Sequence, residues 1–305
     1  MTRETATEPL INLADIAEIE VFILKRMKEF TLGNHRSVFN GPGFNFVGTR
    51  DWEPGDPVSG IDWAQSSLTG FSPMITREFE QDSTAPMFAV ADASLSTRCG
   101  ARGTLIAAAV ARAIAALGLS GVLFQDLFGL ITFDEKFRRV AVAPTRVGKP
   151  HVLYCLDLYQ RGQEIDDGGH RDDLIAALAV QLRRTCLVPV VSDFLGPGAP
   201  RLIHELSILN ATHDVFLVMV DARFAYQLTD VSAGWIETLD VETGATRLLS
   251  RREFGRLAAR VAEWQEMIVS VARDADLDVV RIGLDRWEME AALAQFVVER
   301  RLRKV

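Results

Sequence analysis

Every third or fourth residue near the amino terminus is apolar, which predicts one helix with an apolar face. These positions are Leu13, Ile16, Ile19, Ile23 and Met27. Asn12 is suited to cap the start of this helix, and Gly33 is suited to end it. The pattern therefore predicts a single amphipathic helix before the chain changes character.

Between residues 34 and 83 the helical pattern is lost. Glycines separate short aromatic segments there, at Gly41, Gly43, Gly48, Gly55, Gly60 and Gly70. This spacing is typical of short strands joined by turns. We expect a small β-rich module, which together with the preceding helix forms a first domain over residues 1–83.

From residue 84 onward, apolar runs of strand length alternate with segments of helical period. The runs of strand character cover residues 88–92, 127–133, 137–142, 186–193, 215–220 and 279–282. The helical patterns cover residues 101–117, 149–160, 171–184, 200–209, 252–272 and 287–302. Repeated strand–helix order predicts an α/β fold for residues 84–305, with a doubly wound, mainly parallel sheet and helices on both faces.

Three details qualify this second domain. Residues 235–249 alternate around a Glu-Thr-Gly turn, which predicts an inserted β-hairpin. Gly118 is expected to end the helix over 101–117. Pro189 lies inside the strand over 186–193 and lacks the amide that a central strand donates. We expect either a bulge at Pro189 or an amide position that faces no partner.

The composition is that of an ordinary folded protein, since 48% of the 305 residues are hydrophobic and 24% are charged. A net charge of −8 disfavours nucleic-acid binding, which requires a basic face. No uninterrupted apolar stretch reaches the roughly 20 residues of a membrane span, and the first residues lack the apolar core of a secretory signal. Cys99, Cys155 and Cys186 lie far apart, as expected of reduced thiols in a cytoplasmic protein.

Two predicted strands end on acidic residues that we expect to converge. Asp92 ends the strand over 88–92 and is followed by Ser94 and Ser96, while Asp193 ends the strand over 186–193. Neighbouring parallel strands lie about 5 Å apart, and two carboxylates at that distance repel by about 3 kcal/mol at an effective dielectric constant near 20. A hard cation relieves this repulsion, and so does protonation of one acid.

Carboxylate and hydroxyl oxygens are the ligands that Mg²⁺ and Mn²⁺ prefer. We therefore expect a metal site formed by Asp92, Ser94, Ser96 and Asp193. Such a site offers a binding surface at the carboxyl edge of the sheet, and we assign no catalytic residue to it.

Three alternative roles for these residues stay open. Asp and Ser also favour helix caps and turns, which need no ligand. In a second alternative, Asp92 is the nucleophile of a metal-dependent phosphohydrolase, because aspartate forms covalent intermediates. The haloacid-dehalogenase-like phosphatases have a second acid where this chain has Ser94. The third alternative is a scaffold protein whose metal site is degenerate.

The Asp92-x-Ser94-x-Ser96 sequence resembles the metal-ion-dependent adhesion site of von Willebrand factor A domains. Ser192-Asp193 stands where that motif has its later acidic loop. In that family an acidic residue of a partner protein completes the coordination of the metal. The family also supplies a threonine ligand, whereas the matching region, 168–174, contains no threonine. If the resemblance holds, Asp172 or a water molecule takes the place of the threonine ligand.

A second resemblance is carried by Trp52-Glu53-Pro54-Gly55-Asp56 and Ile61-Asp62-Trp63. These residues are similar to the signature of the family called domain of unknown function 58, over about residues 40–300. Pro54 and Gly55 fit a type II turn. Ile61 and Trp63 are expected on one face of a strand, with Asp62 on the other. Pro54, Gly55, Asp56, Asp62 and Trp63 are thus assigned mainly structural roles.

Members of this family resemble adaptor proteins that work with MoxR-type AAA+ ATPases. The resemblance implies a non-enzymatic, cytoplasmic interaction protein whose partner is such an ATPase or its client. No nucleic acid and no membrane span are expected.

Overall fold

The computed structural model describes residues 9–33, 45–53, 61–80, 86–101, 104–162, 173–226, 234–239 and 246–283, with 289, 291–293, 295–297 and 300. The chain divides into two compact units, residues 27–84 and residues 1–26 with 85–305. The expected boundary after residue 83 lies beside the observed one. The amino-terminal helix, however, belongs to the larger unit as far as Arg26.

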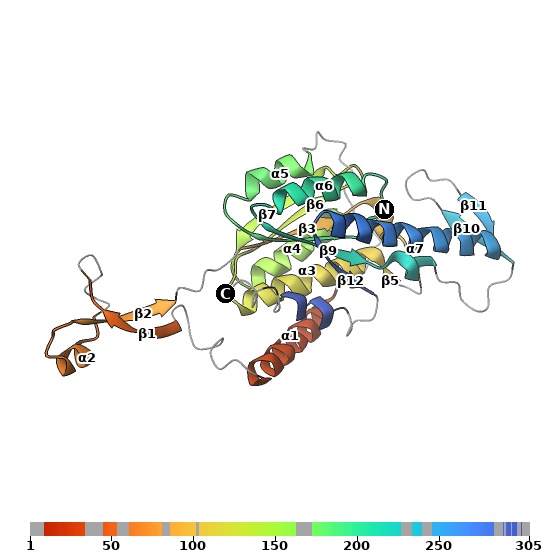
Figure 1. Cartoon of the computed structure of the whole chain (residues 1–305). Helices are drawn as coiled ribbons and strands as arrows, with labels where there is room; N and C mark the ends of the chain where they lie inside the picture. Colours follow the sequence, from red (N-terminus) through yellow and green to blue (C-terminus); the bar gives the residue numbers. More distant parts are fainter. Residues whose placement is uncertain are drawn as a thin grey trace, which may run out of the picture. The chain divides into compact units, whose positions relative to one another are not determined.

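A six-stranded sheet forms the centre of the larger unit (Figure 1). In spatial order its strands are β12 (Asp278–Ile282), β9 (Asp214–Val220), β8 (Leu187–Ser192), β3 (Met87–Asp92), β6 (Phe128–Phe133) and β7 (Arg139–Arg146). The first five are mutually parallel, and β7 is an antiparallel edge strand. Every residue of the four central strands is buried, as expected for parallel strands covered on both faces. The predicted mainly parallel α/β sheet is confirmed.

Helices cover both faces of this sheet (Figure 1). On one face, α5 (Leu174–Gln181), α6 (Ala199–Leu209) and α7 (Arg251–Asp274) contribute to one apolar core with residues of the central strands. On the other lie α3 (Ile106–Leu123) and α4 (Lys149–Gly162). Helix α1 (Leu13–Gly33) is fixed to α3 by a buried ion pair of 2.7 Å between Asp15 and Arg112.

The strand order creates a topological switch point between β3 and β8. From β3 the chain continues to β6 and β7 on one side, and from β8 it continues to β9 and β12 on the other. In open α/β sheets, ligands bind outside the carboxyl ends of the strands at such a point. The sheet therefore places the ends of β3 and β8 at its most favourable binding position.

Pro189 lies within β8 without ending it. The ladder between β8 and β9 is continuous and includes the pair Pro189–Phe216. The pairs between β3 and β8, in contrast, omit Val188 and Pro189. The missing amide therefore falls on the β3 side, where the ladder is interrupted.

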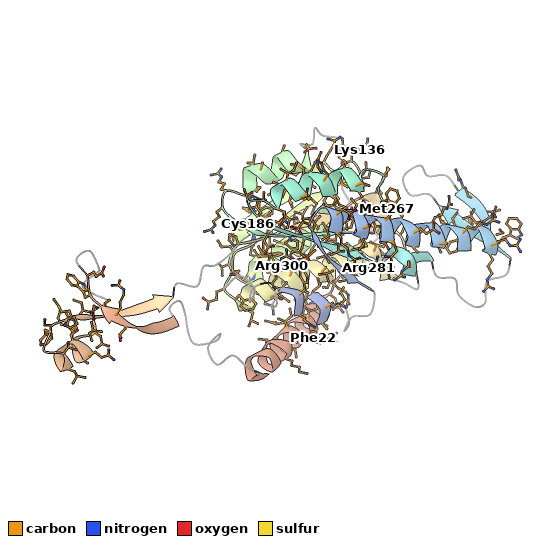
Figure 2. The ribbon with its side chains drawn as sticks, viewed as in Figure 1. Phe22, Lys136, Cys186, Met267, Arg281 and Arg300 are labelled. Atoms are coloured by element: carbon orange, nitrogen blue, oxygen red, sulfur yellow. The ribbon has the colours of Figure 1, made fainter. Side chains whose placement is uncertain are left out.

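Arg300, the last described residue, lies at the amino edge of the sheet, opposite the carboxyl ends of the strands (Figure 2). Arg300 donates from Nε to Oδ1 of Asp214 at 2.7 Å and also pairs with Asp278. Its guanidinium lies 5.1 Å from the centre of the Phe216 ring. These contacts hold the last described residues against β9 and β12.

Among the described residues, α3 is long and apolar enough to cross a membrane by length and composition. However, 78% of this helix is buried inside the protein. A core helix that is mostly buried inside a protein meets the same length and composition criterion, so this helix alone is weak evidence for a membrane span.

Gly118 does not end α3, so that prediction was wrong. The helix continues to Leu123, and Gly118 lies in its interior. A Cβ atom at Gly118 would lie 2.7 Å from Cγ1 of Val152 in α4. The glycine permits the close approach of two helices, a role that local sequence does not reveal.

Gly118→Ala is expected to destabilise the protein, although alanine is the better helix former. Overpacking costs about 1–3 kcal/mol, which exceeds the gain of up to about 1 kcal/mol from helix propensity. The matched control is Gly255→Ala in α7, where an added Cβ meets nothing within 4 Å. Urea unfolding should show a lower free energy of unfolding for Gly118→Ala and a higher one for Gly255→Ala, each relative to the wild type. A gain at both positions would mean that α4 readily moves aside.

The smaller unit contains an antiparallel pair, β1 (Asn45–Asp51) and β2 (Ile75–Glu80), with α2 (Trp63–Leu68) between them in sequence. The expected strand through residues 61–63 was wrong. Asp62 is buried and caps α2, since its Oδ1 accepts hydrogen bonds of 3.1 Å from the amides of Ala64 and Gln65. Aspartate strongly favours this position, so Trp63 starts the helix and is 57% exposed.

Of the other family-motif residues, Pro54, Gly55 and Asp56 lie outside the described residues. In the larger unit, β10 (Trp235–Leu239) and β11 (Thr246–Ser250) pair antiparallel at the position of the expected hairpin. Ser250 then caps α7 directly. The described residues between 289 and 300 are helical, within the range expected for the last helix.

Candidate metal centre

Four neighbouring parallel strands each end at an aspartate on the carboxyl edge of the sheet. These residues are Asp221 after β9, Asp193 after β8, Asp92 at the end of β3 and Asp134 after β6. The edge thus carries a row of carboxylates, and their partners differ between the outer and the inner positions.

The two outer aspartates are neutralised by arginines. Arg138 Nη2 lies 2.7 Å from Oδ2 of Asp134, and Arg223 Nε donates to Oδ1 of Asp221 at 2.8 Å. Although burial acts to raise it, the hydrogen bonds and charge of Arg138 hold the pKa of Asp134 below its ordinary value. Arg223 lowers the pKa of Asp221 against the same effect of burial.

Asp92 is held by neutral donors instead. Its Oδ2 accepts a hydrogen bond of 2.5 Å from the hydroxyl of Ser192, and its Oδ1 accepts one of 2.9 Å from the amide of Ser94. The hydroxyl of Tyr159 donates to the Asp92 carbonyl at 2.9 Å. Burial raises the pKa of Asp92 against the opposing effect of the Ser192 and Ser94 hydrogen bonds.

Asp193 has one carboxylate oxygen without a hydrogen bond. Its Oδ1 accepts from the amide of Leu195 at 3.0 Å, whereas Oδ2 is buried and has no partner within the described part of the chain. Burial, and next the charge of Asp92, raise the pKa of Asp193 to about 7. The structure therefore brings these two acids into electrostatic contact at the switch point, where no described arginine or lysine pairs with either of them.

The Ser94 amide donates a hydrogen bond to Asp92, and the Ser94 hydroxyl forms a hydrogen bond of 2.9 Å with the hydroxyl of Ser96. Ser94 is buried and precedes the short 3₁₀ helix η2 (Leu95–Arg98), but its hydroxyl makes no capping hydrogen bond. The alternative that the Ser94 hydroxyl serves as a helix cap is therefore not supported. The turn is held instead by the Asp92 carboxylate and by Thr97, whose hydroxyl donates to the Ser94 carbonyl at 2.7 Å.

Sequence reasoning omitted Ser192 from the expected ligand set. This residue ends β8, and its hydroxyl both donates to Asp92 and accepts from the amide of Phe194 at 2.9 Å. Its position next to Asp193, at the end of an apolar run, was the available signal. Ser192 is the hydroxyl that joins the ends of the two central strands.

The donor atoms here are hard oxygens, which suit Mg²⁺ or Mn²⁺. Within the described ranges, no group of three or more His, Cys, Asp or Glu side chains is placed to hold a metal. The site instead combines the carboxylates of Asp92 and Asp193 with the hydroxyls of Ser94 and Ser96. One oxygen of this set, Oδ2 of Asp193, has no partner among the described residues. Of the region 168–174, which was matched to the threonine ligand, residues 168–172 lie outside the described ranges. Asp173 caps α5, and Leu174 is buried.

Comparison with known proteins identifies one family and several relatives. The family described as "Protein of unknown function DUF58" matches residues 48–265. An uncharacterized protein of Mycobacterium bovis is 27% identical over 312 aligned positions, which cover 99% of this chain and 93% of the relative. An uncharacterized protein of Mycobacterium tuberculosis matches with the same identity and coverage.

Two solved structures are similar at low identity. The conserved hypothetical protein BatB from Bacteroides thetaiotaomicron is 11% identical, with a TM-score of 0.37, over 70% of this chain and 98% of that chain. An aerotolerance-related membrane protein from Bacteroides fragilis is also 11% identical, with a TM-score of 0.39, over 70% of this chain and 99% of that chain.

Proposed function

The chain belongs to the DUF58 family, and we propose that it is a non-enzymatic interaction protein that binds a partner through a divalent cation. The larger unit is then a von Willebrand factor A-like domain. Asp92, Ser94, Ser96 and Asp193 hold Mg²⁺ or Mn²⁺ at its carboxyl edge. One observation carries this proposal: Oδ2 of Asp193 is buried, has no hydrogen-bond partner among the described residues, and lies near a second buried acid.

The outer aspartates show why a cation is expected at the inner pair. Buried carboxylates are stable when a positive charge neutralises them, as Arg138 does for the buried Asp134. Arg223 does the same for the half-buried Asp221. Asp92 and Asp193 receive only hydroxyl and amide hydrogens in the described part of the chain. A divalent cation supplies the missing charge and accepts the hydroxyl oxygens as further ligands.

A cation held by these groups keeps coordination positions for an outside ligand. We propose that an acidic side chain of a partner protein occupies one of them. The family resemblance suggests a MoxR-type AAA+ ATPase or its client, in the cytoplasm, as that partner. The buried thiols of Cys155 and Cys186 are compatible with a reducing compartment.

The phosphohydrolase alternative receives less support. Asp92 is only 5% exposed, and both of its carboxylate oxygens accept hydrogen bonds. A nucleophile must present an oxygen to its substrate. The scaffold alternative has one favourable observation, because an Asp193 pKa of about 7 allows a proton to replace the cation.

Titration with Mn²⁺ at pH 8 tests the proposal by calorimetry and thermal unfolding. A cation at 100 times its Kd should stabilise the native state by about 2.7 kcal/mol. Ser94→Ala and Ser96→Ala each remove one hydroxyl ligand and should weaken Mn²⁺ binding about tenfold, by analogy with the loss of a supporting group at metal sites. Ser120→Ala is the matched control, since that buried hydroxyl donates only to the α3 carbonyl of Ala116 at 2.7 Å.

Absence of both heat and stabilisation with Mn²⁺ and Mg²⁺ would contradict the metal site. Partner capture that is unaffected by a chelator would favour the metal-free scaffold. Turnover of an aryl phosphate that disappears in Asp92→Asn would favour the phosphohydrolase.

A further inference from the structure

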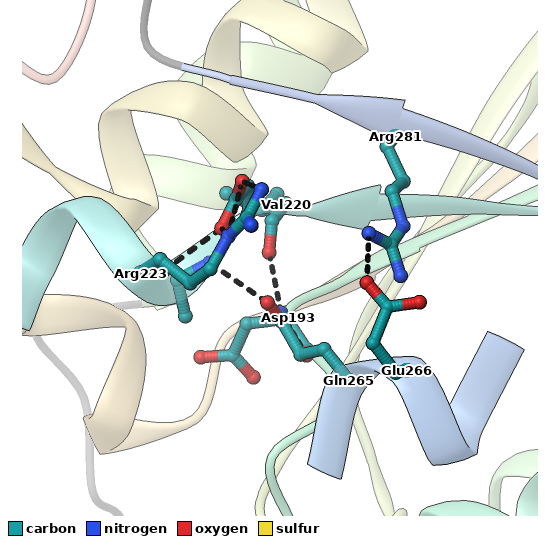
Figure 3. A network of polar contacts seen from close by, with 8 residues as sticks. Asp193, Val220, Arg223, Gln265, Glu266 and Arg281 are labelled. Carbon is teal, nitrogen blue, oxygen red and sulfur yellow. Dashed lines mark hydrogen bonds and ion pairs between the residues drawn. The ribbon is translucent and has the colours of Figure 1, made fainter. Parts of the chain in front are cut away.

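Helix α7 reaches the carboxyl edge beside Asp193 through two consecutive polar side chains. These residues are Gln265 and Trp264. Figure 3 shows Gln265 between the ends of β8 and β9. Its amide Nε2 donates to the carbonyls of Asp193 at 3.0 Å and of Val220 at 2.9 Å. Its Oε1 accepts from the amide of Ala222 at 3.3 Å. One buried side chain thus ties together the backbones that follow two central strands.

The second side chain fixes the next peptide. Trp264 Nε1 donates to the carbonyl of Phe194 at 2.8 Å. Phe194 has a φ of 53°, in the left-handed region that residues other than glycine rarely adopt. Ser192 accepts from the Phe194 amide on the other side. The peptides on both sides of Phe194, the first of which begins at Asp193, are therefore held in this unfavourable conformation by hydrogen bonds from α7 and β8.

We propose that Gln265, assisted by Trp264, is a positioning residue for the metal centre. Repulsion from Asp92 and loss of hydration both favour rotation of the Asp193 carboxylate away from the buried site. No side chain of the described residues restrains Oδ2 directly. The restraint comes from the backbone, which α7 holds through the Asp193 and Phe194 carbonyls.

An uncharged amide suits this task. It has two N–H donors, which both carbonyls require, and it adds no positive charge. An arginine at position 265 would neutralise the acid pair as Arg138 and Arg223 neutralise the outer aspartates. Glutamine instead fixes the geometry while the acid pair stays available to a cation. This inference rests on the proposed metal site and assigns the residues that keep it assembled.

The test compares two amide side chains at opposite edges of the same sheet. Asn210 is the control: its Oδ1 accepts from the Val215 amide at 2.9 Å, and its Nδ2 donates to the Asp276 carbonyl at 3.2 Å. Gln265→Leu and Asn210→Leu should both lower the melting temperature. Only Gln265→Leu should weaken Mn²⁺ binding by calorimetry, by about tenfold, the lower end of the range for supporting groups at metal sites.

Trp264→Phe keeps an aromatic ring and removes only the indole N–H. It should weaken Mn²⁺ binding several-fold, and it serves as the second variant if Gln265→Leu does not fold. Equal Mn²⁺ affinity in wild type, Gln265→Leu and Trp264→Phe would overturn the positioning role and leave the metal site standing. A wild-type protein that binds no Mn²⁺ would overturn the proposed function and this inference with it.

Discussion

Asp193→Asn is expected to stabilise the metal-free protein at pH 8, whereas most substitutions of buried residues destabilise. The pKa of Asp193 is raised to about 7, so its ionised form is unfavourable in the folded state at pH 8. At 1.36 kcal/mol per pKa unit, the gain is on the order of a few kcal/mol. Asparagine retains the oxygen that accepts from Leu195. Thermal unfolding in a chelator should show a rise of roughly 5 °C or more.

Asp134→Asn is the matched control and should have the opposite effect. Asp134 is as deeply buried as Asp193 and also follows a central strand, but it pairs with Arg138. Its substitution removes that ion pair and should cost about 1–3 kcal/mol. Mn²⁺ should stabilise Asp134→Asn as it stabilises the wild type, and it should not stabilise Asp193→Asn. Loss of stability in both metal-free variants would show that the acid pair is not strained.

The stability of the metal-free protein is expected to decrease as the pH rises from about 4 to about 7. Asp193 has a folded-state pKa of about 7 against an ordinary value of 3.8, so the folded state binds more protons than the unfolded state in this window. Excess protons on the folded state make the free energy of unfolding fall with rising pH. The raised pKa of Asp92 acts in the same direction. Above both folded-state pKa values this dependence ends.

Two histidines act in the opposite sense. Burial lowers the pKa of His151 and of His213, so their contribution to stability is lost as the pH falls below the ordinary histidine value. The difference between wild type and Asp193→Asn removes this background. Urea unfolding in the presence of a chelator should show that the free energy of unfolding of the wild type is lower at pH 8 than at pH 5. This difference between the two pH values should be smaller in Asp193→Asn. An identical pH dependence in both proteins would contradict the raised pKa.

Local sequence determined the class of the fold. Parallel strands are buried on both faces, so they appear as uninterrupted apolar runs, and the intervening helices show their own period. The order of elements from β3 to β12 follows from this alternation. The same patterns located Asp92 and Asp193, because the carboxyl end of a buried strand is where polar residues resume.

Local sequence misled where one residue type serves two purposes. Gly118 fits a helix end, but it also fits the close contact with Val152 that the structure contains. Asp62 fits an alternating strand, but its carboxylate caps α2. The hydrophobic pattern reveals neither the contact between Gly118 and Val152 nor the short helix that Asp62 caps.

The tertiary structure alone decided which aspartates have no positive partner among the residues that the structure describes. The arginines of the outer pair are close in sequence, four residues after Asp134 and two residues after Asp221. The inner pair depends on Ser192, 100 residues from Asp92, and on Gln265, 72 residues from Asp193. Such contacts follow from the strand order and from the path of α7, and chain separations of this size leave no local pattern in the sequence.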